Sequence, residues 1–98
     1  MFKSIKYSIV VAVYNRPEEM EELLYSLNNQ SYKNFELIIV DDGSQMSSRD
    51  VYNFYKKKFQ ISYYFIDNQG PAMARNFGVN KASGEWIIFF DSDCTIPR

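Results

Sequence analysis

Apolar runs recur along the chain at intervals that leave room for a helix between each pair. Ser8–Val13, Phe35–Val40 and Ile61–Ile66 are rich in β-branched and aromatic residues, which is typical of strands. Trp86–Phe90 is apolar without a break, so we predict a fourth strand that is buried on both faces. The pattern therefore predicts a sheet of strands separated by helices.

The segments between these runs have helical periodicity. Pro17 suits the first position of a helix, and the residues that follow repeat their apolar positions at the spacing of one helical face: Met20, Leu23, Leu24 and Leu27. Ser47 or Ser48 can cap a second helix, whose predicted buried side carries Val51, Phe54, Tyr55 and Phe59. Pro71 opens a third helix, which is built from small residues.

Alternating strands and helices favour an α/β fold with a mainly parallel sheet and right-handed crossovers. We predict one domain over residues 1–98, with three layers in the order helix, sheet, helix. In such folds ligands bind beyond the carboxyl ends of the strands. Any functional site is therefore expected at that edge of the sheet.

Each predicted strand ends in polar residues: Asn15, Asp41-Asp42, Asp67-Asn68 and Asp91-Ser92-Asp93. Aspartate and asparagine are common in turns and caps, which is the simplest interpretation of some of these positions. Two carboxylate doublets at one edge repel each other unless a cation lies between them, which favours a metal site. Hard cations such as Mg²⁺ or Mn²⁺ prefer oxygen ligands of this kind.

The amino-acid composition limits which catalytic groups and which partners the chain can have. The formal net charge is −1, which gives no general attraction to nucleic acid. The sequence has no histidine and a single cysteine, Cys94, so neither an imidazole base nor an intrachain disulfide is available. No apolar run is long enough to span a bilayer. We expect a cytoplasmic protein, with association at the cytoplasmic face of the membrane as the alternative.

Two common phosphate-binding motifs are absent from the sequence. No Gly-x-Gly-x-x-Gly follows the first strand, and no Gly-Lys-Ser/Thr occurs anywhere. A bound pyrophosphate would then need its charge balanced in another way. A metal held by Asp91 and Asp93 would do this, helped by the guanidinium of Arg75.

Four motifs in order resemble the opening of a family 2 glycosyltransferase. They are Val11 to Pro17 (VAVYNRP), Gln30 to Ser44 (QSYKNFELIIVDDGS), Asn68 to Gly78 (NQGPAMARNFG) and Ala82 to Asp93 (ASGEWIIFFDSD). The resemblance covers essentially the whole chain and implies the GT-A fold, of which this would be the Rossmann-like half.

The resemblance also implies site residues. Ala12 and Tyr14 resemble positions that hold the nucleotide base, Tyr14 by stacking, and Asp42 resembles the carboxylate that accepts a hydrogen bond from it. Arg75 resembles the basic residue near the pyrophosphate. Asp91 resembles the group near ribose and metal, and Asp93 resembles the direct ligand of Mg²⁺ or Mn²⁺. Asp41 is interpreted as a structural turn residue.

The implied function is transfer, with inversion, of a sugar from a nucleoside diphosphate, most simply a UDP-sugar, to a glycan or lipid-linked acceptor hydroxyl. In that family the acceptor site and the catalytic base lie well beyond the Asp-x-Asp motif. We therefore expect the base beyond Arg98 and a 98-residue chain that does not transfer sugar alone. Self-association through an open sheet edge is also expected.

Two alternatives remain open at this point. One is a non-catalytic nucleotide-binding or interaction module. The other is a metal-dependent nucleotidyltransferase, although Tyr14-Asn15-Arg16-Pro17 lacks the glycine-rich, basic signature that such enzymes usually carry after the first strand.

Overall fold

The structure is a computed structural model that describes residues 7–31 and 34–91, Asp91 by its main chain alone. Strands and helices alternate throughout, as predicted. In chain order the elements are β1 (Tyr7–Val13), α1 (Pro17–Asn28), β2 (Phe35–Asp42), α2 (Arg49–Tyr55), β3 (Ile61–Ile66), α3 (Pro71–Lys81) and β4 (Trp86–Asp91).

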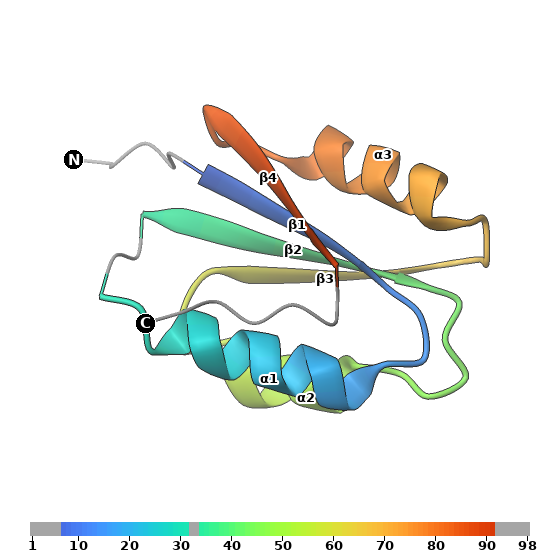
Figure 1. The fold of residues 1–98 in the computed structure, drawn as a ribbon, viewed down its shortest axis with the longest axis horizontal. Coiled ribbons are helices and arrows are strands. Elements are labelled where there is room, and N and C mark those ends of the chain that lie inside the picture. The colour runs from blue at the N-terminus through green and yellow to red at the C-terminus, as the bar shows by residue number, and fades with distance from the viewer. Residues whose placement is uncertain (1–6, 32–33, 92–98) are drawn as a thin grey trace.

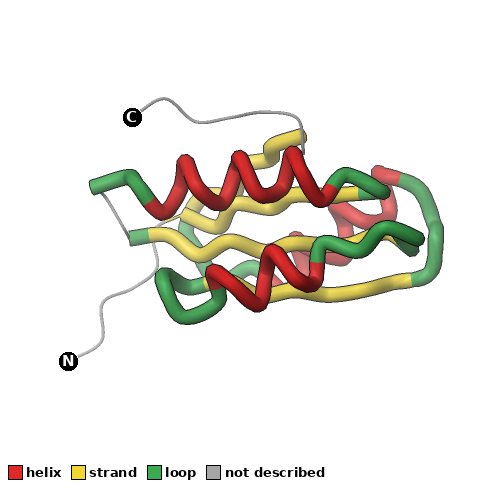
Figure 2. Tube along the Cα trace, turned by 90° about the horizontal axis from the view of Figure 1, so that it is seen from below, coloured by secondary structure: helices red, strands yellow, loops and turns green. Residues whose placement is uncertain are grey.

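The four strands form one parallel sheet in the order β3-β2-β1-β4. Helices α1 and α2 cover one face, and α3 covers the other (Figure 1). Seen from below, α1 and α2 lie next to each other in front of the strands (Figure 2). The predicted three-layer α/β/α architecture is confirmed.

Strand alternation divides the core into two layers. Ile9, Val11 and Val13 of β1 face α1, whose predicted apolar face is buried at every position: Met20, Leu23, Leu24 and Leu27. Val10 of the same strand faces the other way, toward Ala74 of α3. The central strand therefore contributes side chains to both layers, which is why its sequence is apolar without alternation.

Helix α2 is shorter and less buried than predicted. Phe54, predicted to be buried, is exposed, whereas the neighbouring Tyr55 is buried. The helix ends at Tyr55, so Phe59 lies beyond it. At the other end, Ser47 Oγ accepts a hydrogen bond from the amide of Arg49 at 3.0 Å, whereas Ser48 at the cap position makes no such bond.

The prediction that β4 is buried on both faces is wrong. Trp86 is 60% exposed and Phe89 49% exposed, and within the described residues β4 pairs only with β1. A run of apolar side chains shows that burial would be favourable, but it does not show which element supplies the cover. β4 is an edge strand with an apolar surface, and β1 and β2 are the central strands.

Candidate functional site

An open pocket of about 250 Å³ lies at the carboxyl ends of β1 and β2. The end of each strand and the loop that leads into α3 form its walls. The lining residues are Ala12, Val13, Tyr14, Asp42, Asn68, Gly70 and Pro71. The pocket therefore occupies the edge of the sheet at which ligands bind in parallel α/β folds.

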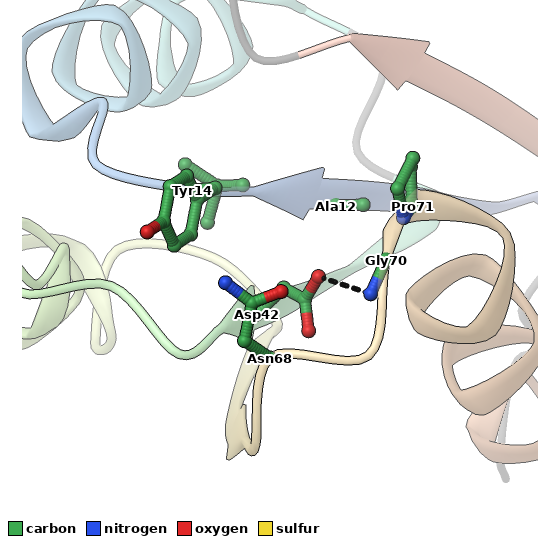
Figure 3. A pocket seen from close by; sticks show the side chains of 7 residues that line it. Ala12, Tyr14, Asp42, Asn68, Gly70 and Pro71 are labelled. Atoms are coloured by element: carbon green, nitrogen blue, oxygen red, sulfur yellow. Dashed lines mark hydrogen bonds between the residues drawn. The ribbon is translucent and has the colours of Figure 1, made fainter.

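Asp42 lies in the wall of this pocket and holds the loop before α3. One carboxylate oxygen accepts a hydrogen bond from the amide of Gln69 at 2.8 Å, and the other accepts one from the amide of Gly70 at 2.9 Å. In Figure 3 the carboxylate lies between the ring of Tyr14 and the start of α3 at Pro71. Each carboxylate oxygen carries two lone pairs, so Asp42 keeps the capacity to accept a further N–H from a ligand.

The loop approaches Asp42 closely because residue 43 is glycine. Gly43 has φ of +77°, and a Cβ at this position would lie 2.9 Å from the backbone nitrogen of Asn68. Any side chain here would meet both backbone strain and a steric clash. The glycine therefore lets the ends of β2 and β3 come together under the pocket.

Asp41 precedes Asp42 in the same strand but faces the α1/α2 layer. It is fully buried and accepts hydrogen bonds from the amides of Ser44 at 3.1 Å and Ser48 at 3.4 Å. The hydroxyl of Tyr63 also donates to Asp41. Burial and, after it, this hydrogen bond raise the pKa of Tyr63 to about 12.

The carboxylates of Asp41 and Asp42 each have protein donors as partners. We predicted a metal site from the repulsion between the doublets Asp41-Asp42 and Asp91-Ser92-Asp93, and it stays a prediction because the side chains of Asp91 and Asp93 lie outside the described part of the chain. Alternation along the strand sends the side chains of Asp41 and Asp42 to opposite faces, where N–H and O–H donors surround each of them. The interpretation of Asp41 as a structural residue agrees with its contacts.

Asn15 ties the loop after β1 to the loop after β2. Its backbone has φ of +54°, a left-handed conformation that asparagine tolerates better than most residues. The side-chain oxygen accepts hydrogen bonds from the amides of Gln45 at 2.8 Å and Met46 at 3.0 Å. The backbone N–H of Asn15 donates a hydrogen bond to Ser44 Oγ at 2.8 Å. This clamp fixes the loop that carries Tyr14.

Three of the predicted site residues meet in the pocket: Ala12, Tyr14 and Asp42. Tyr14 is 47% exposed, which leaves its ring accessible. Arg75 lies in the second turn of α3, is exposed and does not line this pocket. The main chain of Asp91 pairs in register with Ala12, and Asp93 lies outside the described residues.

The structure describes only the backbone of the predicted metal-binding segment, as far as Asp91. β4 runs parallel to β1 and brings the backbone of Asp91 beside Ala12 in the pocket wall. Within residues 7–31 and 34–90, no three acidic side chains gather to form a complete metal site. A cation here would be held by Asp91 and Asp93 and would need further oxygens from a ligand, as phosphate groups provide.

Asn68, Gly70 and Pro71 line the pocket. The sequence interpretation placed Asn68 and Asn15 among the polar residues at the strand ends without a specific role, and it did not include Gly70 or Pro71 in the site. The signal for the pocket-lining group was present in Asn68-Gln69-Gly70-Pro71, because a Gly-Pro step directly before a helix marks the point where a loop turns toward it. Nothing in the sequence indicated that Asn15 would join two loops.

A parallel α/β sheet with a pocket at the ends of its central strands defines the class of doubly wound, ligand-binding α/β proteins. The model of glycosyl transferase family 2 matches residues 8–98. The chain belongs to this family, and its fold is the predicted Rossmann-like part of the GT-A fold.

Comparisons with known proteins agree. A poly(ribitol-phosphate) beta-glucosyltransferase of Bacillus spizizenii is 42% identical over 94 residues, which is 91% of this chain and 15% of the relative. The crystal structure of S. aureus TarS 1-349 in complex with UDP has a TM-score of 0.83 and 34% identity, over 90% of this chain and 27% of TarS 1-349. The mannosyltransferase PcManGT from Pyrobaculum calidifontis, in complex with GDP-Man and Mn²⁺, shares the fold with a TM-score of 0.86 at 21% identity, over 99% of this chain and 30% of PcManGT.

The chain spans only 14% to 35% of the length of several curated relatives that it matches. Among the described residues, no helix has the length and apolar character needed to cross a membrane.

Proposed function

We propose that the chain binds the nucleoside diphosphate part of a sugar donor, most simply a UDP-sugar, as the N-terminal subdomain of an inverting glycosyltransferase. The observation that carries this proposal is the pocket that joins Tyr14 and Asp42 in a chain of glycosyl transferase family 2. The relative TarS, which shares 34% identity, was crystallised with UDP. The whole enzyme would transfer the sugar to a hydroxyl of a glycan or lipid-linked acceptor.

In this proposal the base lies in the pocket beside Tyr14. An exposed aromatic ring offers a flat surface for stacking, and base stacking contributes about 1–3 kcal/mol. The carboxylate of Asp42 accepts an N–H from the base through a lone pair that the amides of Gln69 and Gly70 leave open. Ala12 has a short side chain, which leaves room between these two groups.

The diphosphate would lie near the end of β4, where Mg²⁺ or Mn²⁺ would balance its charge together with Arg75 of α3. Asp91 and Asp93 would hold the cation, and Arg75 would contact phosphate oxygens through its guanidinium fork. When bound, the cation supplies Lewis-acid stabilisation of the departing diphosphate. A carboxylate beyond Arg98 would take the proton of the acceptor hydroxyl. The cytoplasm, or its membrane face, is the expected location.

Calorimetric titration of the 98-residue chain with UDP and GDP, in Mn²⁺ and in EDTA, tests this proposal. We expect UDP to bind weakly in EDTA and more tightly in Mn²⁺. Asp67→Ala, which changes an exposed aspartate beyond the pocket, is the matched control and should bind UDP as the parent chain does. No binding of either nucleotide in Mn²⁺ would contradict the proposal and favour a non-catalytic interaction module.

An assay of sugar transfer separates binding from catalysis. We expect no transfer from a UDP-sugar by the 98-residue chain, because the base and acceptor site are proposed to lie beyond it. Metal-dependent transfer by the purified chain would refute that placement. Metal-dependent formation of a nucleotide-sugar from a nucleoside triphosphate would instead identify a nucleotidyltransferase.

We also propose that a second copy of the chain pairs with β4. The two edge strands of the sheet differ: on β3, Arg49 lies over Tyr63 at 5.3 Å and Lys81 over Tyr64 at 5.4 Å. β4 carries no charged residue from Trp86 to Phe90, so this part of the strand has no charge that opposes pairing with an identical strand. Antiparallel pairing of two β4 strands around a two-fold axis would close this edge.

Light scattering after size exclusion tests the pairing. We expect the parent chain to form a dimer as its concentration rises, and Phe89→Lys to remain monomeric because it places a charge on the paired edge. Phe54→Lys changes a more exposed aromatic residue on α2, away from that edge, and should still dimerise. A parent chain that stays monomeric at high concentration would contradict the pairing.

A further inference from the structure

Besides Asp41 and Asp42, another buried carboxylate lies at the end of the sheet opposite to the pocket. Glu36 is the second residue of β2 and is 6% exposed. In the sheet it pairs in register with Ser8 of β1, which is fully buried. A buried carboxylate is costly unless donors surround it, so its partners indicate what it does.

One oxygen of Glu36 accepts three hydrogen bonds from two segments of the chain. Ser8 Oγ donates to Glu36 Oε2 at 2.6 Å. The amide and the hydroxyl of Ser83 donate to the same oxygen at 2.7 Å and 2.9 Å. All three donors are neutral, and hydrogen bonds to an ionised acceptor are stronger than bonds between neutral groups. Glu36 therefore joins β1, β2 and the turn after α3.

The turn continues the network at Gly84. The backbone N–H of Gly84 donates a hydrogen bond to Ser8 Oγ at 2.8 Å. Ser8 Oγ therefore accepts one hydrogen bond from Gly84 and donates one to Glu36. A Cβ at residue 84 would lie 2.7 Å from that hydroxyl oxygen and 2.8 Å from the Ser8 nitrogen. Only glycine allows the turn to approach β1 this closely, two residues before β4 begins at Trp86.

The position of this turn matters because β4 has one neighbour among the described strands. Its register with β1 runs from Tyr7↔Trp86 to Ala12↔Asp91. A slip of one residue turns every side chain of a strand to the other face of its sheet. With no second described strand to fix it, β4 depends on its contacts with β1 and on the turn that precedes it.

We propose that Glu36 is a positioning residue of the site, which fixes the register of β4 and so brings Asp91 beside Ala12. At about 3.3 Å per residue, β4 carries this alignment over roughly 16 Å, from Trp86 to Asp91 beside the pocket. The proposal rests on the proposed function only in that Asp91 matters for ligand binding. The anchoring itself is independent of any ligand.

Amide hydrogen exchange on Glu36→Gln tests the anchoring. Glutamine keeps the size of the side chain and one oxygen, but an amide oxygen is a weaker acceptor than a carboxylate oxygen for the three donors that meet at Oε2. We expect the protected amides of β4 to exchange about tenfold faster, while those that join β1 to β2 change by less than about twofold. Ser83→Ala, which removes only one donor, should give a smaller change with the same pattern.

Tyr63→Phe is the matched control, because it removes a hydrogen bond to a buried carboxylate near the other edge of the sheet. It should not raise exchange selectively in β4. An equal rise in exchange across all four strands of Glu36→Gln would show a general loss of stability and would overturn the proposal. Unchanged exchange in β4 would overturn it as well.

Nucleotide binding supplies a second measurement. In Glu36→Gln we expect UDP affinity in EDTA to stay within about twofold of the parent, and the gain in affinity on adding Mn²⁺ to fall about tenfold or more. An undiminished Mn²⁺ effect together with looser β4 amides would overturn the link to the site. If the parent chain shows no Mn²⁺ effect at all, the proposed function fails, and hydrogen exchange still decides whether Glu36 anchors β4.

Discussion

Asp41 and Asp42 are neighbours in the sequence with the same side chain, yet they belong to different parts of the molecule. Asp41 is enclosed by the start of α2 and by Tyr63, and all its described partners are protein donors. Asp42 lies in the wall of an open pocket and holds the loop before α3. Because side chains alternate along a strand, Asp41 points into the interior and stabilises the fold, whereas Asp42 lines the pocket, where a ligand could reach it.

The largest effect is expected from Asp41→Ala. The change leaves two amides and one hydroxyl in the interior without their acceptor, so we expect a loss of roughly 3–5 kcal/mol in the free energy of unfolding. A small domain has little more than this to lose. Urea denaturation followed by circular dichroism measures it, with Asp67→Ala as the exposed control. A loss below about 1 kcal/mol would contradict the role of Asp41.

Asp42→Ala should affect binding more than folding. It removes the acceptor for two partly buried amides, which predicts a loss of about 1–3 kcal/mol in stability. We expect UDP affinity to fall by about tenfold or more, since the loop moves and the base loses its acceptor. Calorimetry on a variant that denaturation shows to be folded makes the measurement. Unchanged UDP affinity in that variant would separate Asp42 from the nucleotide.

The pH dependence of stability in Tyr63→Phe tests the hydrogen bond between Tyr63 and the buried Asp41. The pKa of Tyr63 is raised to about 12 from its ordinary value of 10.0, chiefly by burial and then by the hydrogen bond to Asp41. Between these values the unfolded chain loses the proton and the folded chain keeps it, so the protein loses stability as pH rises from 10 to 12. Urea midpoints across this window should fall less steeply in the variant. Parallel curves would contradict the prediction.

The smallest effect is expected at Ser48, whose amide donates to Asp41. Among the described residues its hydroxyl oxygen is a buried polar atom without a hydrogen-bond partner. Ser48→Ala removes this oxygen and keeps the amide, so stability should be unchanged or higher by up to about 1 kcal/mol. Thermal unfolding measures the difference. A clear loss of stability would show that the hydroxyl has a partner in solution.

The sequence predicted the elements well, because an apolar period reports directly on secondary structure. It failed for Phe54 and for the burial of β4, since exposure depends on which element covers a side chain. It did not distinguish the two aspartates by geometry, and it did not reveal Asn15 or Glu36, whose partners are brought near only by the fold. The pocket joins Ala12, Tyr14 and Asp42 as the resemblance implied, while their roles in binding remain predictions.

The place of β1 in the sheet also bears on the order of folding. Tyr7 at its start pairs with Phe35 on one side and with Trp86 on the other. A nascent chain emerges from its amino end, so β1 can meet β2 early but must wait for β4 until nearly all of this chain has been synthesised. Contacts between distant segments also form slowly. The strand at the centre of the finished sheet is therefore, during synthesis, an exposed edge for most of the time.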